Sequence, residues 1–317
     1  MLPTSQLMFR TRSITSSFCI VVLLLTGFFI SNAQGAETKA RIMTWVPPYA
    51  VETCKNRLKE SFNGIGMKDG LTHLGLQFWH PTKDGGIKLV NRFRPIDDSS
   101  IAAFQTWGET NNVRVMLCVF NGTSKEWNWE LAKSAFDTNR GRFIDTLINE
   151  TRRLNLGGVD IDFEGKGTRS EDKQAYIDFI IELASRLHAE GKELTVDTFA
   201  YKWNAPNQGW WSSLLPHIDG LHVMGYSDTG SNSSKWRSYD FIKKATEPYS
   251  SKLLIGVPSF KDSWQETPVQ EHLNWIKNDA KIGVAIWDAQ LKSPAWRTQE
   301  LWQTLSIIKG AQTSANQ

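Results

Sequence analysis

The sequence predicts an α/β protein folded as a single (β/α)8 TIM barrel. Short apolar segments, which are typical of buried parallel strands, alternate with longer segments that carry apolar residues at helical spacing. Eight such pairs follow one another along the chain, and that number fits a closed barrel better than an open sheet. No glycine-rich dinucleotide or phosphate fingerprint follows a strand, which also argues against an open, doubly wound sheet.

The predicted elements follow in chain order. The strands are short runs rich in apolar and β-branched residues: Arg41–Val46, Thr72–Trp79, Val113–Phe120, Gly157–Glu164, Glu193–Phe199, Gly220–Tyr226, Lys252–Pro258 and Gly283–Trp287. The helices between them are amphipathic: Val51–Phe62, Ile96–Thr110, Asn128–Arg153, Ser170–Glu190, Trp210–His217, Ser238–Glu247, Pro268–Asp279 and Trp296–Ile308. In such a barrel, the residues at the carboxyl ends of the strands meet at the face that carries the active site.

Residues 1–36 have the features of a secretory signal peptide. Arg10 and Arg12 precede an apolar run from Phe18 to Ile30, and small residues follow that run. The run is short for a membrane span, and no later segment is apolar for long enough to anchor the mature chain. We therefore expect residues 37–317 to form one secreted or periplasmic domain without a membrane span. An uncleaved N-terminal anchor is the alternative.

Charge and cysteine content limit the possible partners. Removing Arg10 and Arg12 from the 36 basic residues leaves 34 against 33 acidic residues. This balance argues against nucleic acid as a partner, because phosphate binding needs a basic surplus. Cys54 and Cys118 remain in the mature chain, where either one disulfide or two unpaired buried thiols would be compatible with export. We expect a monomer.

The segment Gly157–Glu164 is the most informative part of the chain. Side chains alternate along a strand, so Asp160, Asp162 and Glu164 share one face, while the other face is apolar. Buried carboxylates are costly unless they are paired, hydrogen-bonded or neutralised. The pattern therefore predicts a reaction centre rather than a structural strand. A solvated acidic edge is the structural alternative, but the flanking residues are those of a core strand.

The order of the three carboxylates limits the mechanism. Glu164 is the last residue of the predicted strand and should lie at the barrel mouth, with Asp162 below it and Asp160 deeper. Asp162 is therefore poorly placed to act as a direct nucleophile. The arrangement suits one acid that protonates a leaving oxygen and a neighbouring carboxylate that orients another group and shifts the pKa of that acid. None of the six His residues pairs with an acid at metal-ligand spacing on a strand end, so we expect no metal and no cofactor.

These residues carry a resemblance to a known family. Gly157–Glu164 resembles the signature strand of glycoside hydrolase family 18, which contains chitinases and endo-β-N-acetylglucosaminidases. Met224-Gly225-Tyr226 ends the sixth predicted strand and resembles the Met-x-Tyr segment of that family. Trp287 ends the eighth, where the family keeps a Trp beneath the reacting sugar. The resemblance covers the whole predicted barrel and identifies residues 37–317 as a glycoside hydrolase catalytic domain.

The resemblance implies a role for each matching residue. Glu164 would protonate the glycosidic oxygen and then act as the base for water. Asp162 would orient the substrate's 2-acetamido group, whose carbonyl oxygen attacks C1, giving retention by substrate assistance. Tyr226 would donate a hydrogen bond to the same group, and Asp160 would share a proton or hydrogen bond with Asp162. Trp287 would form the floor of the sugar site.

Further aromatic residues are candidates for sugar binding, because indole rings stack on sugar faces. The expected substrate-binding set, in addition to Trp287, is Met224, Trp45, Trp79 and Trp203. The implied substrate is β-linked N-acetylglucosamine in a chitin-like polymer, an N-glycan core or a cell-wall glycan. The alternative is a carbohydrate-binding lectin on an inactive barrel, but that function usually accompanies loss of the acid, and Glu164 is present.

The chain departs from the family pattern at three places. Gly157 stands where the family motif begins with Asp, Cys118–Asn121 replaces a Ser-x-Gly-Gly segment, and Ser227 follows Tyr226 where many chitinases have Asp. The acid and the acetamido-orienting Asp are intact. The departures therefore concern substrate and efficiency rather than the class of reaction.

Overall fold

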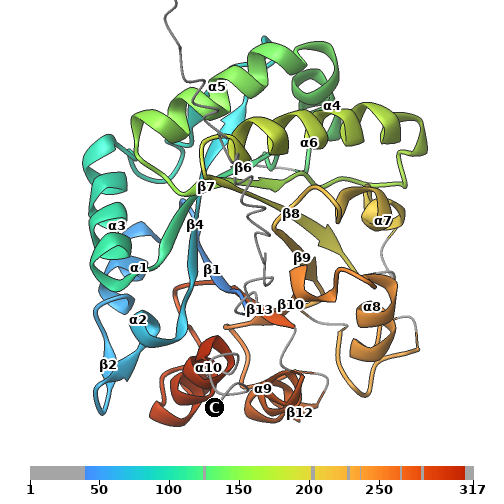
Figure 1. Cartoon of the computed structure of the whole chain (residues 1–317). Helices are drawn as coiled ribbons and strands as arrows, with labels where there is room; N and C mark the ends of the chain where they lie inside the picture. The colour runs from blue at the N-terminus through green and yellow to red at the C-terminus, as the bar shows by residue number, and fades with distance from the viewer. Residues whose placement is uncertain are drawn as a thin grey trace, which may run out of the picture. The chain divides into compact units, whose positions relative to one another are not determined.

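The computed structural model describes residues 40–123, 126–200, 204–226, 229–235, 237–264, 266–279 and 282–310. The predicted signal peptide, residues 1–36, lies outside them. Within the described ranges, eight parallel strands form the barrel (Figure 1): β1 (Ile42–Val46), β4 (His73–Pro81), β6 (Arg114–Phe120), β7 (Gly158–Asp162), β8 (Glu193–Phe199), β9 (Gly220–Met224), β10 (Leu253–Pro258) and β13 (Gly283–Trp287). Their hydrogen-bonded order runs from β1 through β13, β10, β9, β8, β7 and β6 to β4, which pairs with β1 and closes the barrel. The predicted fold is confirmed.

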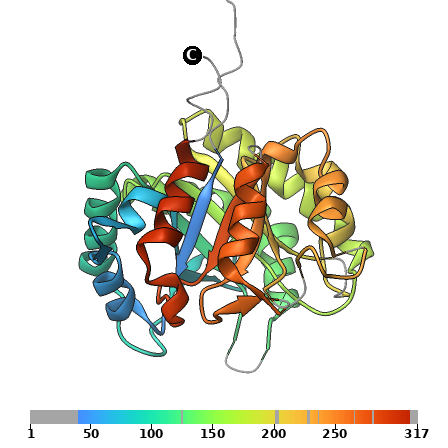
Figure 2. The same cartoon turned by 90° about the horizontal axis from the view of Figure 1, so that it is seen from below.

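Helices lie around the strands and run alongside them (Figure 2). They are α1 (Val51–Arg57), α2 (Met67–Gly70), α3 (Asp98–Asn111), α4 (Trp129–Lys133), α5 (Arg140–Arg153), α6 (Lys173–His188), α7 (Trp211–Leu214), α8 (Tyr239–Ala245), α9 (Val269–Asn278) and α10 (Gln299–Gly310). No helix within the described ranges is long and apolar enough to cross a membrane. Short helical turns are η1 (Ser134–Thr138), η2 (Ser170–Asp172), η3 (Gln208–Trp210), η4 (Ser250–Lys252) and η5 (Pro294–Trp296).

Several elements differ from the prediction. The first predicted helix ends at Arg57, and a hairpin of β2 (Ser61–Phe62) and β3 (Ile65–Gly66) follows it. The long predicted helix over residues 128–153 is interrupted by η1 and by Asn139, whose side-chain amide donates to the carbonyl oxygens of Ser134 and Lys83. Three more short strands form two pairings that the sequence did not predict: β5 (Ile87–Leu89), antiparallel to β4, and the hairpin of β11 (Ser263–Trp264) with β12 (Thr267–Pro268).

The core has two parts, as the alternation of side chains along strands requires. Outward residues such as Val159 and Ile161 pack with the helices in one large cluster. Inward residues fill the barrel in a second cluster: Met43, Trp45, Met116, Cys118, Leu254 and Ala285. Cys54 and Cys118 are buried free thiols, so of the two expectations for these cysteines the unpaired one is correct.

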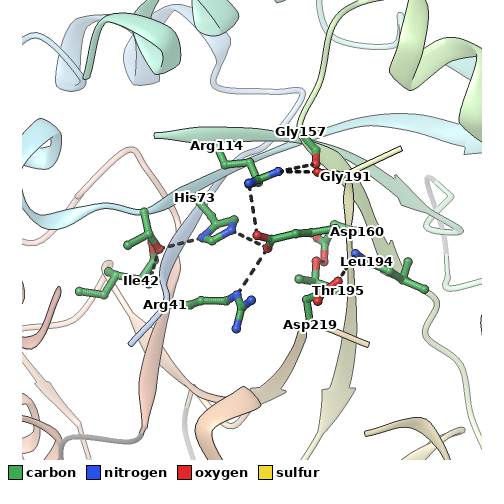
Figure 3. Close-up of polar contacts among 12 residues, drawn as sticks. Arg41, Ile42, His73, Arg114, Gly157, Asp160, Gly191, Leu194, Thr195 and Asp219 are labelled. Carbon is green, nitrogen blue, oxygen red and sulfur yellow. Dashed lines mark hydrogen bonds and ion pairs between the residues drawn. The ribbon is translucent and has the colours of Figure 1, made fainter. Parts of the chain in front are cut away.

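A salt-bridge cluster lies at the amino-terminal end of the barrel, where Arg41, His73 and Arg114 point toward one another (Figure 3). They converge on Glu193, with N–O distances of 3.4 Å from Arg41 Nε, 2.9 Å from His73 Nε2 and 3.3 Å from Arg114 Nε. Burial alone would raise the pKa of Glu193, but the hydrogen bond from His73 and the charges of all three partners lower it to about 2. This carboxylate is fully paired, and we interpret it as structural.

Two glycines provide a matched test of packing between strands. A Cβ added to Gly158 would lie 2.1 Å from the carbonyl oxygen of Glu193, whereas one added to Gly141 would have no atom within 4 Å. Gly158→Ala should therefore lower the free energy of unfolding by about 1–3 kcal/mol or more, and Gly141→Ala should leave it unchanged or raise it by up to about 1 kcal/mol. Urea unfolding measures both values. Equal stabilities for the two variants would contradict this packing.

Candidate active site

Three carboxylates rise along β7 toward the carboxyl-terminal mouth of the barrel. Asp160 and Asp162 are buried inside the barrel, and the partly exposed Glu164 lies two residues beyond the end of the strand. The side-chain amide of Asn121, which directly follows β6, binds the backbone of Glu164 and holds that residue in place. Its Nδ2 donates to the Glu164 carbonyl oxygen at 2.7 Å, and its Oδ1 accepts from the Glu164 amide at 2.9 Å. This amide pair continues the sheet where the strand has ended.

Asp160 is the most fully hydrogen-bonded of the three carboxylates. Its Oδ1 accepts from Thr195 Oγ1 at 2.5 Å, and its Oδ2 accepts from Trp45 Nε1 at 2.8 Å. His222 Nδ1 lies 3.4 Å from Asp160 Oδ1. Burial alone would raise the pKa of Asp160, but the contacts with His222, Thr195 and Trp45 outweigh it and lower that pKa. Asp160 is therefore an anion in the folded protein.

Asp162 and Glu164 behave in the opposite way. Burial, together with the negative charge of Asp160, raises the pKa of Asp162 to about 7, although the hydrogen bond from Gln77 Nε2 (2.7 Å) to its Oδ2 acts to lower it. Burial and the nearby charge of Asp162 raise the pKa of Glu164 well above its usual range. Close carboxylates do not all ionise. Near neutral pH the pair therefore keeps at least one proton at the barrel mouth.

Asp197 and His222 complete the buried cluster, although neither was predicted as a site residue from the sequence. His222 Nδ1 lies 2.6 Å from Asp197 Oδ1, and both side chains are buried inside the barrel. Burial, followed by the charges of Asp160 and Asp162, raises the pKa of Asp197 well above its usual value. Alternation along the fifth predicted strand would have placed Asp197 on the same face as Thr195, and His222 lies on the sixth predicted strand.

Two groups in the barrel bring possible metal ligands together. The ligand atoms of Asp160, Asp197 and His222 lie within 4.8 Å of one another, as do those of Cys118, Asp162 and Asp197. Hydrogen bonds from Thr195, Trp45 and His222 already engage the first group. Burial raises the pKa of the Cys118 thiol well above its usual value, as do the nearby carboxylates, and metals bind the thiolate form. This donor chemistry gives neither group a clear fit to a cation.

Tyr226 and Trp287 lie together over the barrel mouth, with ring centroids 6.2 Å apart. The Tyr226 hydroxyl is buried without a hydrogen-bond partner among the described residues. Burial, followed by the charges of Asp197 and Asp162, raises the pKa of the Tyr226 hydroxyl well above its usual value. The hydroxyl therefore keeps its proton and can donate a hydrogen bond to a ligand. Met224 is buried at the end of β9.

The structure corrects the expected roles of two tryptophans. Trp45 is 1% exposed and supports Asp160 from inside the barrel, so it does not form an open sugar platform. Trp79 points outward, where its Nε1 donates to Glu150 of α5 at 3.3 Å. The pairing of β4 with β6 shifts between Gln77 and Trp79, and such a bulge reverses the facing of later residues. Trp203 lies outside the described residues.

A cleft of about 1070 Å³ opens beside this site. Gln77 and Trp287 line its inner end, and they also belong to the site itself, because Gln77 binds Asp162 and Trp287 packs against Tyr226. The cleft therefore leads directly to the carboxylates. This geometry matches what small-ligand sites of (β/α)8 barrels require: an open groove at the carboxyl-terminal face that leads to polar groups with shifted pKa values.

Comparison with known proteins places this geometry in a family. The model of the family described as Glycosyl hydrolases family 18 matches residues 42–315. The uncharacterized glycosylase YvbX of Bacillus subtilis is 23% identical over 174 residues, which are 50% of this chain and 48% of that protein. The cortical fragment-lytic enzyme of the same organism is 28% identical over 105 residues, which are 32% of this chain and 24% of that protein. The matches therefore span about half or less of these relatives.

Solved structures share the fold. A chitinase from Chromobacterium violaceum superposes with a TM-score of 0.65 at 14% identity, covering 85% of this chain and 98% of that one. The spore cortex-lytic enzyme SleL of Bacillus cereus gives a TM-score of 0.64 at 15% identity, covering 86% of this chain and 75% of that one. At this level of identity the similarity establishes the architecture alone.

The raised pKa of Asp162 predicts how stability depends on pH. Its folded pKa of about 7 exceeds the unfolded value of about 3.9, so the folded state binds more protons between these values. The stability it contributes is complete below about pH 4 and is lost as the pH rises through about 7. Asp162→Asn should therefore flatten the decline in unfolding free energy over this range, by up to about 1.4 kcal/mol per pH unit.

Urea unfolding at several pH values measures that slope. Asp145→Asn is the control, since Asp145 is exposed on the outside of α5. An unchanged slope in Asp162→Asn would show that Asp162 does not hold a proton in the folded state.

Proposed function

The chain belongs to glycosyl hydrolase family 18, and from that premise we propose that it is a secreted, retaining glycosidase. Its substrate would be β-linked N-acetylglucosamine in a chitin-like polymer, an N-glycan core or a cell-wall glycan. One observation supports this most strongly: Glu164, with a raised pKa, lies at the barrel mouth next to Asp162, whose pKa is raised to about 7. A carboxyl group that keeps its proton near neutral pH is what a general acid requires.

The proposed reaction has two steps. Glu164 donates its proton to the glycosidic oxygen, and the bond from that oxygen to C1 breaks. The carbonyl oxygen of the 2-acetamido group forms the new bond to C1, while Asp162 accepts a hydrogen bond from the acetamido N–H. Glu164, now a carboxylate, then removes a proton from water as the water oxygen attacks C1 and the acetamido oxygen leaves. Two inversions at C1 give net retention.

The neighbouring residues have supporting roles in this proposal. The Tyr226 hydroxyl, which has no partner among the described residues, would donate a hydrogen bond to the acetamido carbonyl oxygen. Trp287 would pack beneath the reacting sugar. Asp160 and His222 would keep a fixed negative charge below Asp162, which favours the protonated form of Asp162 between turnovers. Asp160 would thus be a positioning residue rather than a group that touches the sugar.

Export and assembly are also proposals. Residues 1–36 support secretion or a periplasmic location, and we propose that the mature domain acts as a monomer. A lectin on an inactive barrel remains the alternative to an enzyme, and hydrolysis by the unmodified protein distinguishes the two.

Glu164→Gln should abolish hydrolysis while sugar binding stays near its original strength. The amide keeps the size and hydrogen-bonding capacity of the side chain but cannot deliver a proton, and general acid catalysis contributes roughly 10²- to 10⁴-fold. Turnover of an N-acetylglucosamine oligomer and binding by calorimetry measure the two effects. Glu271→Gln, an exposed substitution on α9, is the control. If Glu164→Gln keeps more than about a tenth of the turnover, Glu164 is not the acid.

Substrate assistance predicts a specific inhibition pattern. A thiazoline that mimics the cyclised sugar should inhibit competitively, because it resembles the intermediate in shape and charge. An oligomer without acetyl groups should not be cleaved, since it lacks the nucleophile. Both are measured by steady-state kinetics with matched acetylated and deacetylated oligomers. Efficient cleavage of the deacetylated oligomer would instead indicate an enzyme nucleophile, with Asp162 as the first candidate.

A further inference from the structure

We propose that the cleft beside the carboxylates binds a glycan that carries carboxylate groups, so that the substrate is an anionic N-acetylglucosamine glycan rather than neutral chitin. This inference rests on the proposed function and specifies its substrate class. We call the cleft the cationic groove; it is defined by three cations and three exposed aromatic residues: Lys83, Lys88, Arg92, Tyr49, Phe93 and Trp127.

The groove is built by loops at one side of the barrel mouth. Tyr49 follows β1, Lys83 lies in the β4–β5 turn, Lys88 is on β5, and Arg92 and Phe93 follow β5. β5 exists because the chain continues past the bulge in β4 and folds back in an antiparallel pairing, with Trp79 opposite Leu89. Loops at this face of a (β/α)8 barrel commonly determine which substrate is accepted.

Exposed aromatic rings give the groove the character of a sugar site. Among the described residues, seven large hydrophobic side chains are exposed, and three of them line the groove. The rings of Tyr49 and Phe93 meet edge to face with centroids 5.7 Å apart, and the ring centroids of Trp127 and Phe120 are 6.1 Å apart. Exposed aromatic surface carries a cost in water unless a ligand covers it, and sugar rings pack on such faces.

The charges distinguish between sugar polymers. Lys83, Lys88 and Arg92 are exposed or partly exposed, and none has an acidic partner among the described residues. The Arg92 guanidinium lies 5.1 Å from the centroid of the Phe93 ring, which holds it at the groove wall. Glu126 is the one acid in the described lining. On the outer helices, by contrast, Arg residues commonly pair with acids: Arg142 with Asp84, Arg152 with Glu190, Arg153 with Asp98 and Arg186 with Asp145.

His80 does not add to this positive charge. It lines the groove and packs against Phe120. Burial, followed by the charge of Lys88, lowers the pKa of His80 to about 4, so the ring is neutral near neutral pH. A neutral polymer such as chitin offers hydrogen-bond acceptors but no negative charge to the unpaired lysine and arginine side chains. A carboxylate on a neighbouring sugar would form charge-assisted hydrogen bonds with them.

Two kinds of glycan share this chemistry: those with a lactyl ether carboxylate on a muramic-type sugar, and those with a uronic acid. Binding is measured with the Glu164→Gln protein, which does not depend on turnover. The probes are peptide-free glycan strands of alternating N-acetylglucosamine and N-acetylmuramic acid, an N-acetylglucosamine–glucuronic acid oligomer, and a chitooligosaccharide of equal length. Both acidic probes are also prepared with their carboxylates converted to amides.

The groove variant is Lys83→Gln, Lys88→Gln and Arg92→Gln combined. Its control combines Lys59→Gln, Lys68→Gln and Lys244→Gln, which remove the same charge from exposed lysines outside the groove. We expect an acidic probe to bind more tightly than its amide and than the chitooligosaccharide. The groove variant should lose roughly tenfold in affinity for the acidic probe alone, since exposed charge pairs contribute a few-fold each. Added salt should reduce the wild-type preference in the same way.

Each outcome has a separate meaning. A preference for one acidic probe over the other identifies the source of the carboxylate. Equal binding of acid and amide forms, or equal losses in the groove and control variants, overturns the inference while leaving the proposed function intact. If the unmodified protein cleaves none of the acetylated glycans but retains the charge-dependent binding, the proposed hydrolase activity fails and the anionic groove stands.

Discussion

The structure depends on the burial of more carboxylates than it can neutralise. Asp160, Asp162 and Asp197 face the inside of the barrel, and the buried His222 side chain lies beside Asp160 and Asp197. Ionised groups in such an interior repel one another strongly. Asp160 takes the hydrogen bonds and the negative charge. Burial, together with the charge of Asp160, raises the pKa values of Asp162 and Asp197, and burial with the charges of Asp162 and Asp197 raises the pKa of Glu164. Burial and one well-stabilised anion thus favour the protonated forms of Asp162 and Asp197.

The opposite end of the barrel shows what a structural carboxylate looks like in the same fold. Glu193 is also mostly buried, but Arg41, His73 and Arg114 surround it, and its pKa falls to about 2. The two ends therefore use the same chemical group in opposite ways. Stability of the folded state alone would favour the paired arrangement at both ends. The unpaired carboxylates at the carboxyl-terminal face therefore indicate a functional requirement.

Features that depend on local periodicity could be predicted from the sequence. Predictions were wrong or incomplete where a contact between distant segments decided the position of a side chain. The barrel and the carboxylate column on β7 follow from alternation, and both appear in the structure. The prediction for Trp79 was wrong because the bulge after Gln77 reverses the direction in which the later side chains of β4 point. No residue in that segment predicts a bulge. Asp197 was detectable from alternation on its strand, yet its importance appears only when β8 and β9 bring it to His222. Trp45 looked like a strand-end platform, and only its bond to Asp160 shows otherwise.

The protonation of the centre and the charge of the groove bear on each other. An anionic glycan would be repelled from a site in which Asp162 and Glu164 were both ionised, since both carboxyl groups face the reacting sugar in the proposed reaction. With protons retained by that pair, less negative charge at the mouth opposes the attraction of an anionic glycan to Lys83, Lys88 and Arg92 in the groove. The buried anion at Asp160 would then serve a second purpose, because the charge that favours the protonated form of Asp162 also lowers the negative charge that an anionic substrate would meet at the barrel mouth.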